Sequence, residues 1–145
     1  MPNVLVTRTV SADMDKIYAL ISKMTEYPRF MPDLISVELL ETNENTTLTH
    51  WISNVAGRKI EWTERDVFLP AQYRIEYEQI KGDLKKFSGY WQLTPAENGV
   101  EIALYVDFEF GIPMIAGMLN PLLKKAVRDN SENMLKCIDK ELLSV

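Results

Sequence analysis

The sequence predicts an α+β fold, in which antiparallel strands follow one another along the chain and helices stand near both ends. Two observations indicate it. Between residues 33 and 110, apolar and polar residues alternate with the period of two that half-buried strands show. Before and after that region, apolar residues recur every three to four positions, as they do on one face of a helix. The predicted order is one strand, one helix, five or six antiparallel strands and a long C-terminal helix.

The first two elements are a strand and a short amphipathic helix. Residues 4–10 are rich in β-branched side chains, which favour a strand. Ser11 or Asp13 can cap the helix that follows. The apolar face of this helix consists of Met14, Ile17, Tyr18, Ile21 and Met24. The prolines that follow end the helix and allow at most a short second one around residues 26–31.

Four apolar alternations carry the prediction of the sheet. They begin at Ile35, Tyr73, Phe87 and Val100, and the last is the cleanest in the sequence. Turn-forming residues separate the runs, at positions 42–45, 56–57, 70–71, 81–83 and 97–99. Connections this short join neighbouring antiparallel strands, so we expect one face of the sheet to be buried and the other to face water.

The last predicted element is a long helix from Pro121 to about Leu143. Asn120 is a good N-cap, and proline is favoured at the first helical position. The apolar stripe of this helix consists of Leu122, Leu123, Ala126, Val127, Met134 and Ile138. Residues 112–119 are expected to form a separate short helical piece. A long helix on a curved sheet leaves a space between the two, and a ligand would bind there.

Length and composition bound the function. The 145 residues suit one domain over positions 1–145, and 46% hydrophobic residues supply both a core and a cavity lining. The net charge of −5 argues against binding to a nucleic-acid backbone. One cysteine and one histidine exclude an internal disulfide and a multi-histidine metal site. Neither a signal peptide nor a membrane-spanning run is recognised, so we expect a cytoplasmic protein without cofactor or metal.

Three short stretches resemble a known family. They are Glu-Tyr-Pro-Arg-Phe-Met-Pro at 26–32, Trp-Thr-Glu-Arg at 62–65 and Gly-Tyr-Trp-Gln-Leu-Thr-Pro at 89–95. Their order and spacing are similar to the START/Bet v 1-like (SRPBCC) superfamily, in particular its polyketide cyclase/dehydrase and lipid-transport family. The resemblance implies a helix-grip fold, in which a seven-stranded antiparallel sheet wraps around a long C-terminal helix, with short helices after the first strand. It also implies a hydrophobic cavity for a lipid, polyketide, quinone or similar molecule.

Arg65 and Asn130 are the two candidate catalytic residues. Arg65 lies in a stretch similar to one in aromatase/cyclases, whose arginine is held to polarise a polyketide carbonyl, and a permanently charged, planar guanidinium suits that role. Strict alternation places Arg65 on the face of the strand opposite to that of Trp62. Either a bulge turns Arg65 inward or it faces solvent. In the second case it would pair with Glu64 or Asp66.

Asn130 falls on the apolar stripe of the C-terminal helix, and the pair that it forms with Ser131 resembles an Asn-Ser pair in the final helix of the cyclases. The alternative is an asparagine that hydrogen-bonds to the backbone or faces solvent. His50 is expected to be half-exposed in mid-strand, and Asp107 and Glu109 to be solvated charges. Cys137 is expected to be a small packed side chain.

We therefore expect a protein that binds a hydrophobic small molecule between the sheet and the C-terminal helix. The two alternatives are a polyketide aromatase/cyclase or dehydratase, and a partner-binding protein like the ribosome-association toxins or coenzyme-Q-binding chaperones of the superfamily. The residues predicted to contact the ligand are Trp62, Arg65, Tyr77, Phe87, Trp91, Phe108, Met118, Leu122, Asn130 and Met134.

Overall fold

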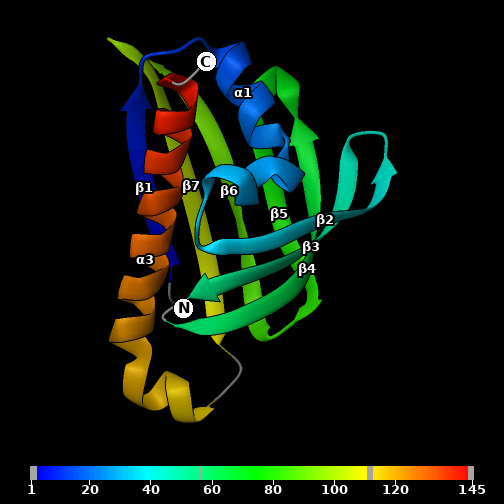
Figure 1. Ribbon diagram of the computed structural model, residues 1–145, viewed down its shortest axis with the longest axis vertical. Helices are drawn as coiled ribbons and strands as arrows, with labels where there is room; N and C mark the ends of the chain where they lie inside the picture. The colour runs from blue at the N-terminus through cyan, green and yellow to red at the C-terminus, as the bar shows by residue number, and fades with distance from the viewer. Residues whose placement is uncertain (1–2, 56, 111–112, 144–145) are drawn as a thin grey trace.

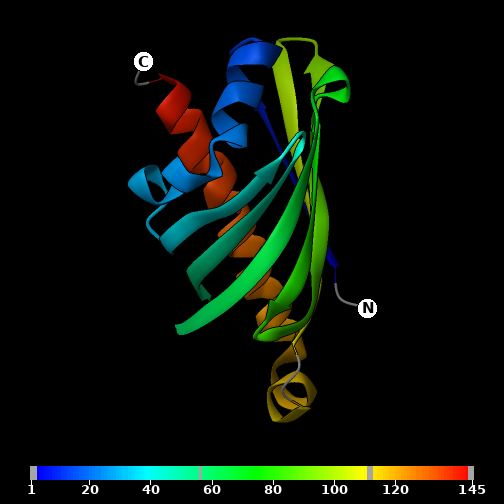
Figure 2. The same cartoon turned by 90° about the vertical axis from the view of Figure 1, so that its right-hand side faces the viewer.

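A seven-stranded antiparallel sheet curves around one long C-terminal helix (Figures 1 and 2). The computed structural model describes residues 3–55, 57–110 and 113–143, without the side chains of residues 110, 113–120 and 122. The strands are β1 Asn3–Val10, β2 Leu34–Asn43, β3 Thr46–Val55, β4 Arg58–Leu69, β5 Arg74–Gly82, β6 Leu84–Ala96 and β7 Gly99–Phe110. The helices are α1 Met14–Ser22, η1 Met24–Glu26, α2 Tyr27–Phe30, η2 Pro70–Gln72 and α3 Pro113–Leu143.

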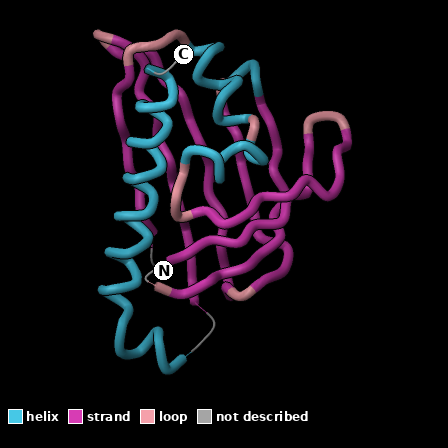
Figure 3. Tube along the Cα trace, viewed as in Figure 1, coloured by secondary structure: helices cyan, strands magenta, loops and turns pink. Residues whose placement is uncertain are grey.

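The order of the strands across the sheet is β1-β7-β6-β5-β4-β3-β2, and every neighbouring pair is antiparallel. The chain therefore begins at one edge and crosses to the opposite edge through the short helices α1, η1 and α2 (Figure 3). It then returns by consecutive connections to pair β7 with β1. The predicted α+β class and the seven-stranded sheet are confirmed.

The N-terminal helix forms as its sequence predicts. Asp13 is the N-cap, and its Oδ1 accepts a hydrogen bond from the backbone N–H of Lys16 at 2.8 Å. The helical spacing turns Ile17 and Ile21 to the same face, where both are completely buried. α1 is thereby fixed over one end of the sheet (Figure 1).

Irregular pairing bends the sheet. The register shifts at two places between β2 and β3, once between β4 and β5 beside Thr63, and once between β6 and β7 beside Leu84. Each such bulge increases the local twist and bends the strand that carries it. The sheet can therefore close around α3, as Figure 2 shows from the side.

The boundary of the C-terminal helix differs from the prediction. The expected break at Asn120 is wrong, because α3 is continuous from Pro113 to Leu143 with Pro121 inside it. Proline lacks an N–H and its ring displaces the preceding turn, so it bends a helix but does not always end it. Figure 1 shows this bend, since the first turns of α3, in gold, lie at an angle to the rest.

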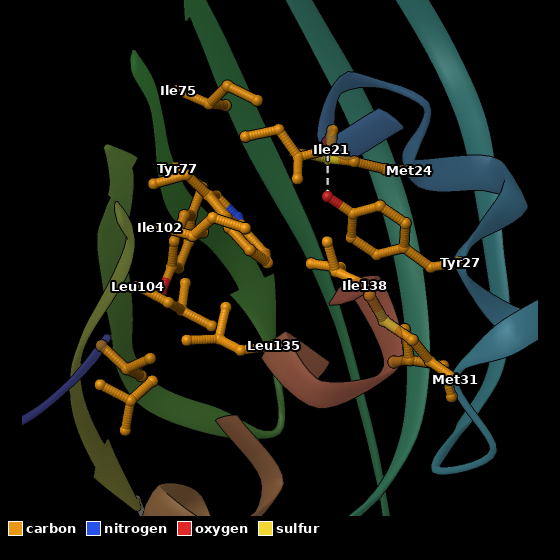
Figure 4. Packing of buried hydrophobic residues seen from close by; sticks show 14 of the residues in the cluster. Ile21, Met24, Tyr27, Met31, Ile75, Tyr77, Ile102, Leu104, Leu135 and Ile138 are labelled. Carbon is orange, nitrogen blue, oxygen red and sulfur yellow. Dashed lines mark hydrogen bonds between the residues drawn. The ribbon is translucent and has the colours of Figure 1, made fainter. Parts of the chain in front are cut away.

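The core is densest between α1, α2 and the second half of α3 (Figure 4). Tyr27 is completely buried there, and its hydroxyl donates to the carbonyl oxygen of Ile21. Ile138 of α3 and Ile102 of β7 are also completely buried. Among the helices in the described part of the chain, none combines the length and the apolar character that crossing a membrane requires.

Candidate functional site

A cavity lies between the inner face of the sheet and the middle of α3. It encloses about 730 Å³ of empty space, counted with its opening to solvent. The volume that compares with that of ligand pockets, which reach roughly 300–1,000 Å³, is only about 70 Å³, so the cavity as it stands is small for a drug-sized molecule. Its walls are formed by Leu34, Trp51, Ser53, Val55, Ile60, Trp62, Glu64, Tyr77, Leu84, Phe87, Trp91, Leu104, Val106, Phe108, Val127, Asn130, Ser131 and Met134.

Two simple periodicities bring these side chains together. On β4 every second residue from Ile60 to Asp66 is buried, and β7 contributes alternate residues in the same way. On α3 the lining positions Val127, Asn130 and Met134 are spaced by three and four, which places them on one helical face. The cavity is therefore built from regular strands and a helix, which hold its walls rigidly.

Aromatic rings form one continuous wall of the cavity. Trp51 of β3 and Trp62 of β4 are directly paired across the two strands, and their rings stack with centroids 5.7 Å apart. Phe87 of β6 lies against Trp62 at 4.9 Å and against Tyr77 at 5.5 Å. Such contacts fix the rings relative to one another and present a flat apolar surface to the cavity.

Tyr77 is held by a hydrogen bond that passes over the neighbouring strand. Its hydroxyl donates to the carbonyl oxygen of Tyr105 on β7 at 2.7 Å, although β6 lies between β5 and β7. The residue of β6 at the crossing is Gly89, which pairs with Tyr77. A Cβ atom at Gly89 would lie 2.6 Å from the Tyr77 hydroxyl and 1.8 Å from the Tyr105 carbonyl oxygen. Glycine at position 89 is therefore a steric requirement of this wall.

Two buried carboxyl groups stand behind the aromatic wall, on consecutive inward positions of β4. Glu64 accepts a hydrogen bond from the indole N–H of Trp62 at 2.8 Å through its Oε1 atom. Asp66 accepts two through Oδ2, from the hydroxyls of Thr49 at 2.6 Å and Thr47 at 3.0 Å. Glu64 is 3% exposed and Asp66 is completely buried, so neither charge is solvated by bulk water.

The two carboxyl groups affect each other's protonation. Burial raises the pKa of Glu64 well above its usual range, and the adjacent Asp66 raises it further. Burial also raises the pKa of Asp66, although hydrogen bonds from Glu64, Thr49 and Thr47 oppose this. Asp66 Oδ1 is buried and has no hydrogen-bond partner among the described residues.

Most of the residues predicted to contact a ligand lie together at this cavity. The lining contains Trp62, Tyr77, Phe87, Trp91, Phe108, Asn130 and Met134. That they bind a ligand stays a prediction. The side chains of Met118 and Leu122 lie outside the described part of the chain.

Arg65 does not belong to this group. Its side chain is exposed on the outer face of β4, opposite the inward-facing Trp62 and Glu64. The irregularity beside Thr63 leaves the alternation of β4 intact, so no bulge turns the arginine inward. The prediction that Arg65 contacts a cavity ligand is therefore withdrawn. The expected pairing with Glu64 or Asp66 is also wrong, because both carboxyl groups point to the other side of the strand.

The remaining candidates have structural partners. Asn130 lines the cavity, and its amide donates to Oδ2 of Asp33 at 3.4 Å, which is a long hydrogen bond. His50 contacts Glu61 on the next strand at 2.6 Å and is partly exposed. Lys86 forms an ion pair with Asp107 at 2.8 Å. Asp107 is only partly exposed and its Oδ1 atom is buried, so it is not the solvated charge that was expected. Cys137 is partly buried against the core, as expected.

The sequence analysis missed Glu64 as a cavity residue. The signal was present, since alternation from Ile60 and Trp62 places position 64 inward as well. Charged residues are usually exposed, and this general preference took precedence over the pattern. The indole N–H of Trp62 that donates to Glu64 depends on side-chain orientation, so the sequence alone does not reveal it. The hydroxyls that donate to the adjacent Asp66 lie on another strand.

Residues 10–135 match the model of the polyketide cyclase/dehydrase and lipid transport family. Among curated proteins, the chain is 27% identical over 111 residues to the ribosome association toxin RatA of Escherichia coli K12. That alignment covers 76% of this chain and 70% of the toxin.

Solved structures share the fold. The protein TTHA0849 of Thermus thermophilus superposes with a TM-score of 0.93 at 24% identity, covering 99% of this chain and 98% of that one. The ZhuI aromatase/cyclase of Streptomyces sp. R1128 superposes with a TM-score of 0.86 at 24% identity, covering 96% and 92%. At these identities the likeness supports a common architecture, and the function has to be argued from the site.

Proposed function

We propose, since the chain belongs to the polyketide cyclase/dehydrase and lipid transport family, that it binds a hydrophobic small molecule in the cavity between the sheet and α3. A lipid, a polyketide or a quinone fits this description. The observation that carries the proposal is the cavity itself, with its wall of stacked rings from β3, β4 and β6. Aromatic and aliphatic lining with few polar groups is typical of pockets for apolar ligands. A cytoplasmic location stays a prediction.

Catalysis is the second candidate function, in the form of polyketide cyclisation or dehydration. The buried acid pair favours it, because a carboxyl group with a raised pKa can serve as a general acid near neutral pH. The outward position of Arg65 weighs against it, because that residue carried the resemblance to the cyclases. We therefore rank binding above catalysis.

Binding to a macromolecular partner such as the ribosome, by analogy with the ribosome association toxin RatA, has less support. The net charge of −5 opposes association with a phosphate backbone.

Blocking the cavity tests the proposed function. Ser131 is 3% exposed and faces the cavity from α3, whereas Asp129, two residues earlier, is exposed. We expect the neutral fluorophore N-phenyl-1-naphthylamine to bind the unmodified protein with a Kd in the micromolar range, about −8 kcal/mol. Ser131→Phe should weaken this binding at least about tenfold by filling the cavity, and the matched Asp129→Phe should leave it unchanged. A folded Ser131→Phe variant that binds as well as the unmodified protein would contradict the proposal.

A further inference from the structure

The cavity carries one carboxyl group in an otherwise mainly apolar lining. Glu64 is the only acidic side chain among the described lining residues and is 3% exposed. A methionine or leucine would fill the same position without the cost of removing a carboxyl group from water. The hydrogen bond that Glu64 accepts comes from Trp62 on the same strand, so this contact joins no other element to the sheet. A role toward the contents of the cavity accounts for its presence.

The hydrogen bonds of the pair determine what Glu64 offers to a ligand. Oδ2 of the neighbouring Asp66 already accepts from the Thr47 and Thr49 hydroxyls. Oε1 of Glu64 accepts the Trp62 N–H but retains a second lone pair. Toward the cavity, Glu64 therefore offers a hydrogen-bond acceptor.

The charge of the ligand adds a second criterion. An anionic head group would lie beside the Glu64 and Asp66 carboxyl groups in a region shielded from bulk water. Coulomb repulsion is strong in such surroundings, so an anionic head group is disfavoured. Among the lining residues that the structure describes, there is no lysine or arginine to compensate it.

We propose that Glu64 determines specificity, and that the cavity selects a neutral apolar molecule bearing a hydroxyl group, an alcohol or a phenol, which donates to the Glu64 carboxyl. This inference rests on the proposed binding function and adds the chemical class of the ligand. An ether or ketone of the same shape lacks the donor, and a carboxylate finds no cationic partner among the described lining residues.

Three probes with one ring system test the proposal. 2-Naphthol carries the donor, 2-methoxynaphthalene only an acceptor, and 2-naphthoate a negative charge at neutral pH. Each competes with N-phenyl-1-naphthylamine for the protein. We expect 2-naphthol to bind about tenfold more tightly than 2-methoxynaphthalene, as one buried hydrogen bond to such a group provides, and 2-naphthoate to bind more weakly than either.

Substitution of Glu64 separates its role from that of the apolar wall. In Glu64→Met the two ligands should bind about equally well, so the preference for 2-naphthol over 2-methoxynaphthalene disappears. The affinity for 2-methoxynaphthalene should stay within about twofold of its value in the unmodified protein. Glu61→Met on the outer face of the same strand should retain the full preference. If Asp66 without its partner prevents folding of Glu64→Met, the double variant Glu64→Met/Asp66→Asn removes that charge and gives the same readout.

The failures of the two proposals are distinguishable. If 2-methoxynaphthalene binds the unmodified protein but 2-naphthol gains nothing, or if the preference persists in a folded Glu64→Met variant, the role of Glu64 is overturned and the binding function stands. If neither the fluorophore nor any naphthalene derivative binds, the binding function is overturned together with this inference.

Discussion

The two ends of the space between the sheet and α3 differ in how they are filled. At one end, α1 and α2 cover the sheet, and Ile17, Tyr27 and Ile138 leave no exposed surface (Figure 4). At the other end lies the cavity. Its described lining comes from the strands and α3, and none of the short helices contributes a residue. The same sheet and the same helix thus form a dense core where extra helices cover them and a binding space where they do not.

Tyr27 stands at the boundary between the two ends. Its ring contacts Trp51 at 5.7 Å and Trp91 at 6.1 Å in edge-to-face geometry, and both tryptophans line the cavity. Its hydroxyl is anchored to α1. The packed end therefore supports the wall of the hollow end, as a rigid binding site requires.

The largest expected effect contrasts two positions of α3, one in the packed core and one at the cavity. Ile138→Ala should lower the free energy of unfolding by about 3–4 kcal/mol, because it leaves a void in a completely packed region. Met134→Ala, one turn away and facing the cavity, should cost roughly 1 kcal/mol, because its side chain is only partly buried. Urea denaturation measures both values. Equal losses would show that the hollow end is packed as tightly as the other.

Gly89→Ala tests how the aromatic wall is held. We expect a loss of about 2–3 kcal/mol, because the added methyl group meets the Tyr105 carbonyl oxygen and the Tyr77 hydroxyl. Adding Tyr77→Phe removes only the hydroxyl contact, so the double variant should remain destabilised relative to Tyr77→Phe alone. Thermal unfolding of the three variants checks this. A neutral Gly89→Ala substitution would contradict the crossing geometry.

The acid pair gives the hollow end a pH dependence. The unfolded chain releases the Glu64 proton near its ordinary pKa of 4.5, whereas the folded chain retains it to higher pH. The folded state then binds more protons, so the contribution of Glu64 to stability is fully present below 4.5 and is lost with rising pH, by at most about 1.4 kcal/mol per pH unit for one proton. Denaturation of the unmodified protein and Glu64→Gln between about pH 5 and 8 compares the slopes. Identical slopes would mean that Glu64 is ionised when folded.

The smallest effect is expected at Arg65. Because its side chain is exposed on the outer face, Arg65→Ala should change the free energy of unfolding by less than about 0.5 kcal/mol. It should also leave the affinity for N-phenyl-1-naphthylamine unchanged. A marked loss of affinity in the fluorescence titration would place the arginine in the binding site after all and restore the comparison with the cyclases.

Local patterns predicted the elements of the fold, and the details that they missed are those that depend on distant residues. The cap at Asp13 and the alternation that turns Trp62 and Trp91 inward are properties of neighbouring positions, so the sequence contains them. The crossing of Tyr77 over Gly89 depends on the register of three strands, which no single segment specifies. The continuation of α3 through Pro121 is likewise not decided by local preferences, which favour a helix start at that residue.

The three tryptophans provide the most direct measurement of the central claim. Trp51, Trp62 and Trp91 are the only tryptophans of the chain, and all three line the cavity. In ¹H–¹⁵N spectra, titration with N-phenyl-1-naphthylamine should therefore shift all three indole N–H signals, while the backbone amides of Ile17 and Ile21 at the packed end stay in place. Unmoved indole signals, with shifts confined to outer-face residues such as His50 and Arg65, would contradict a ligand-binding cavity at this end of the molecule.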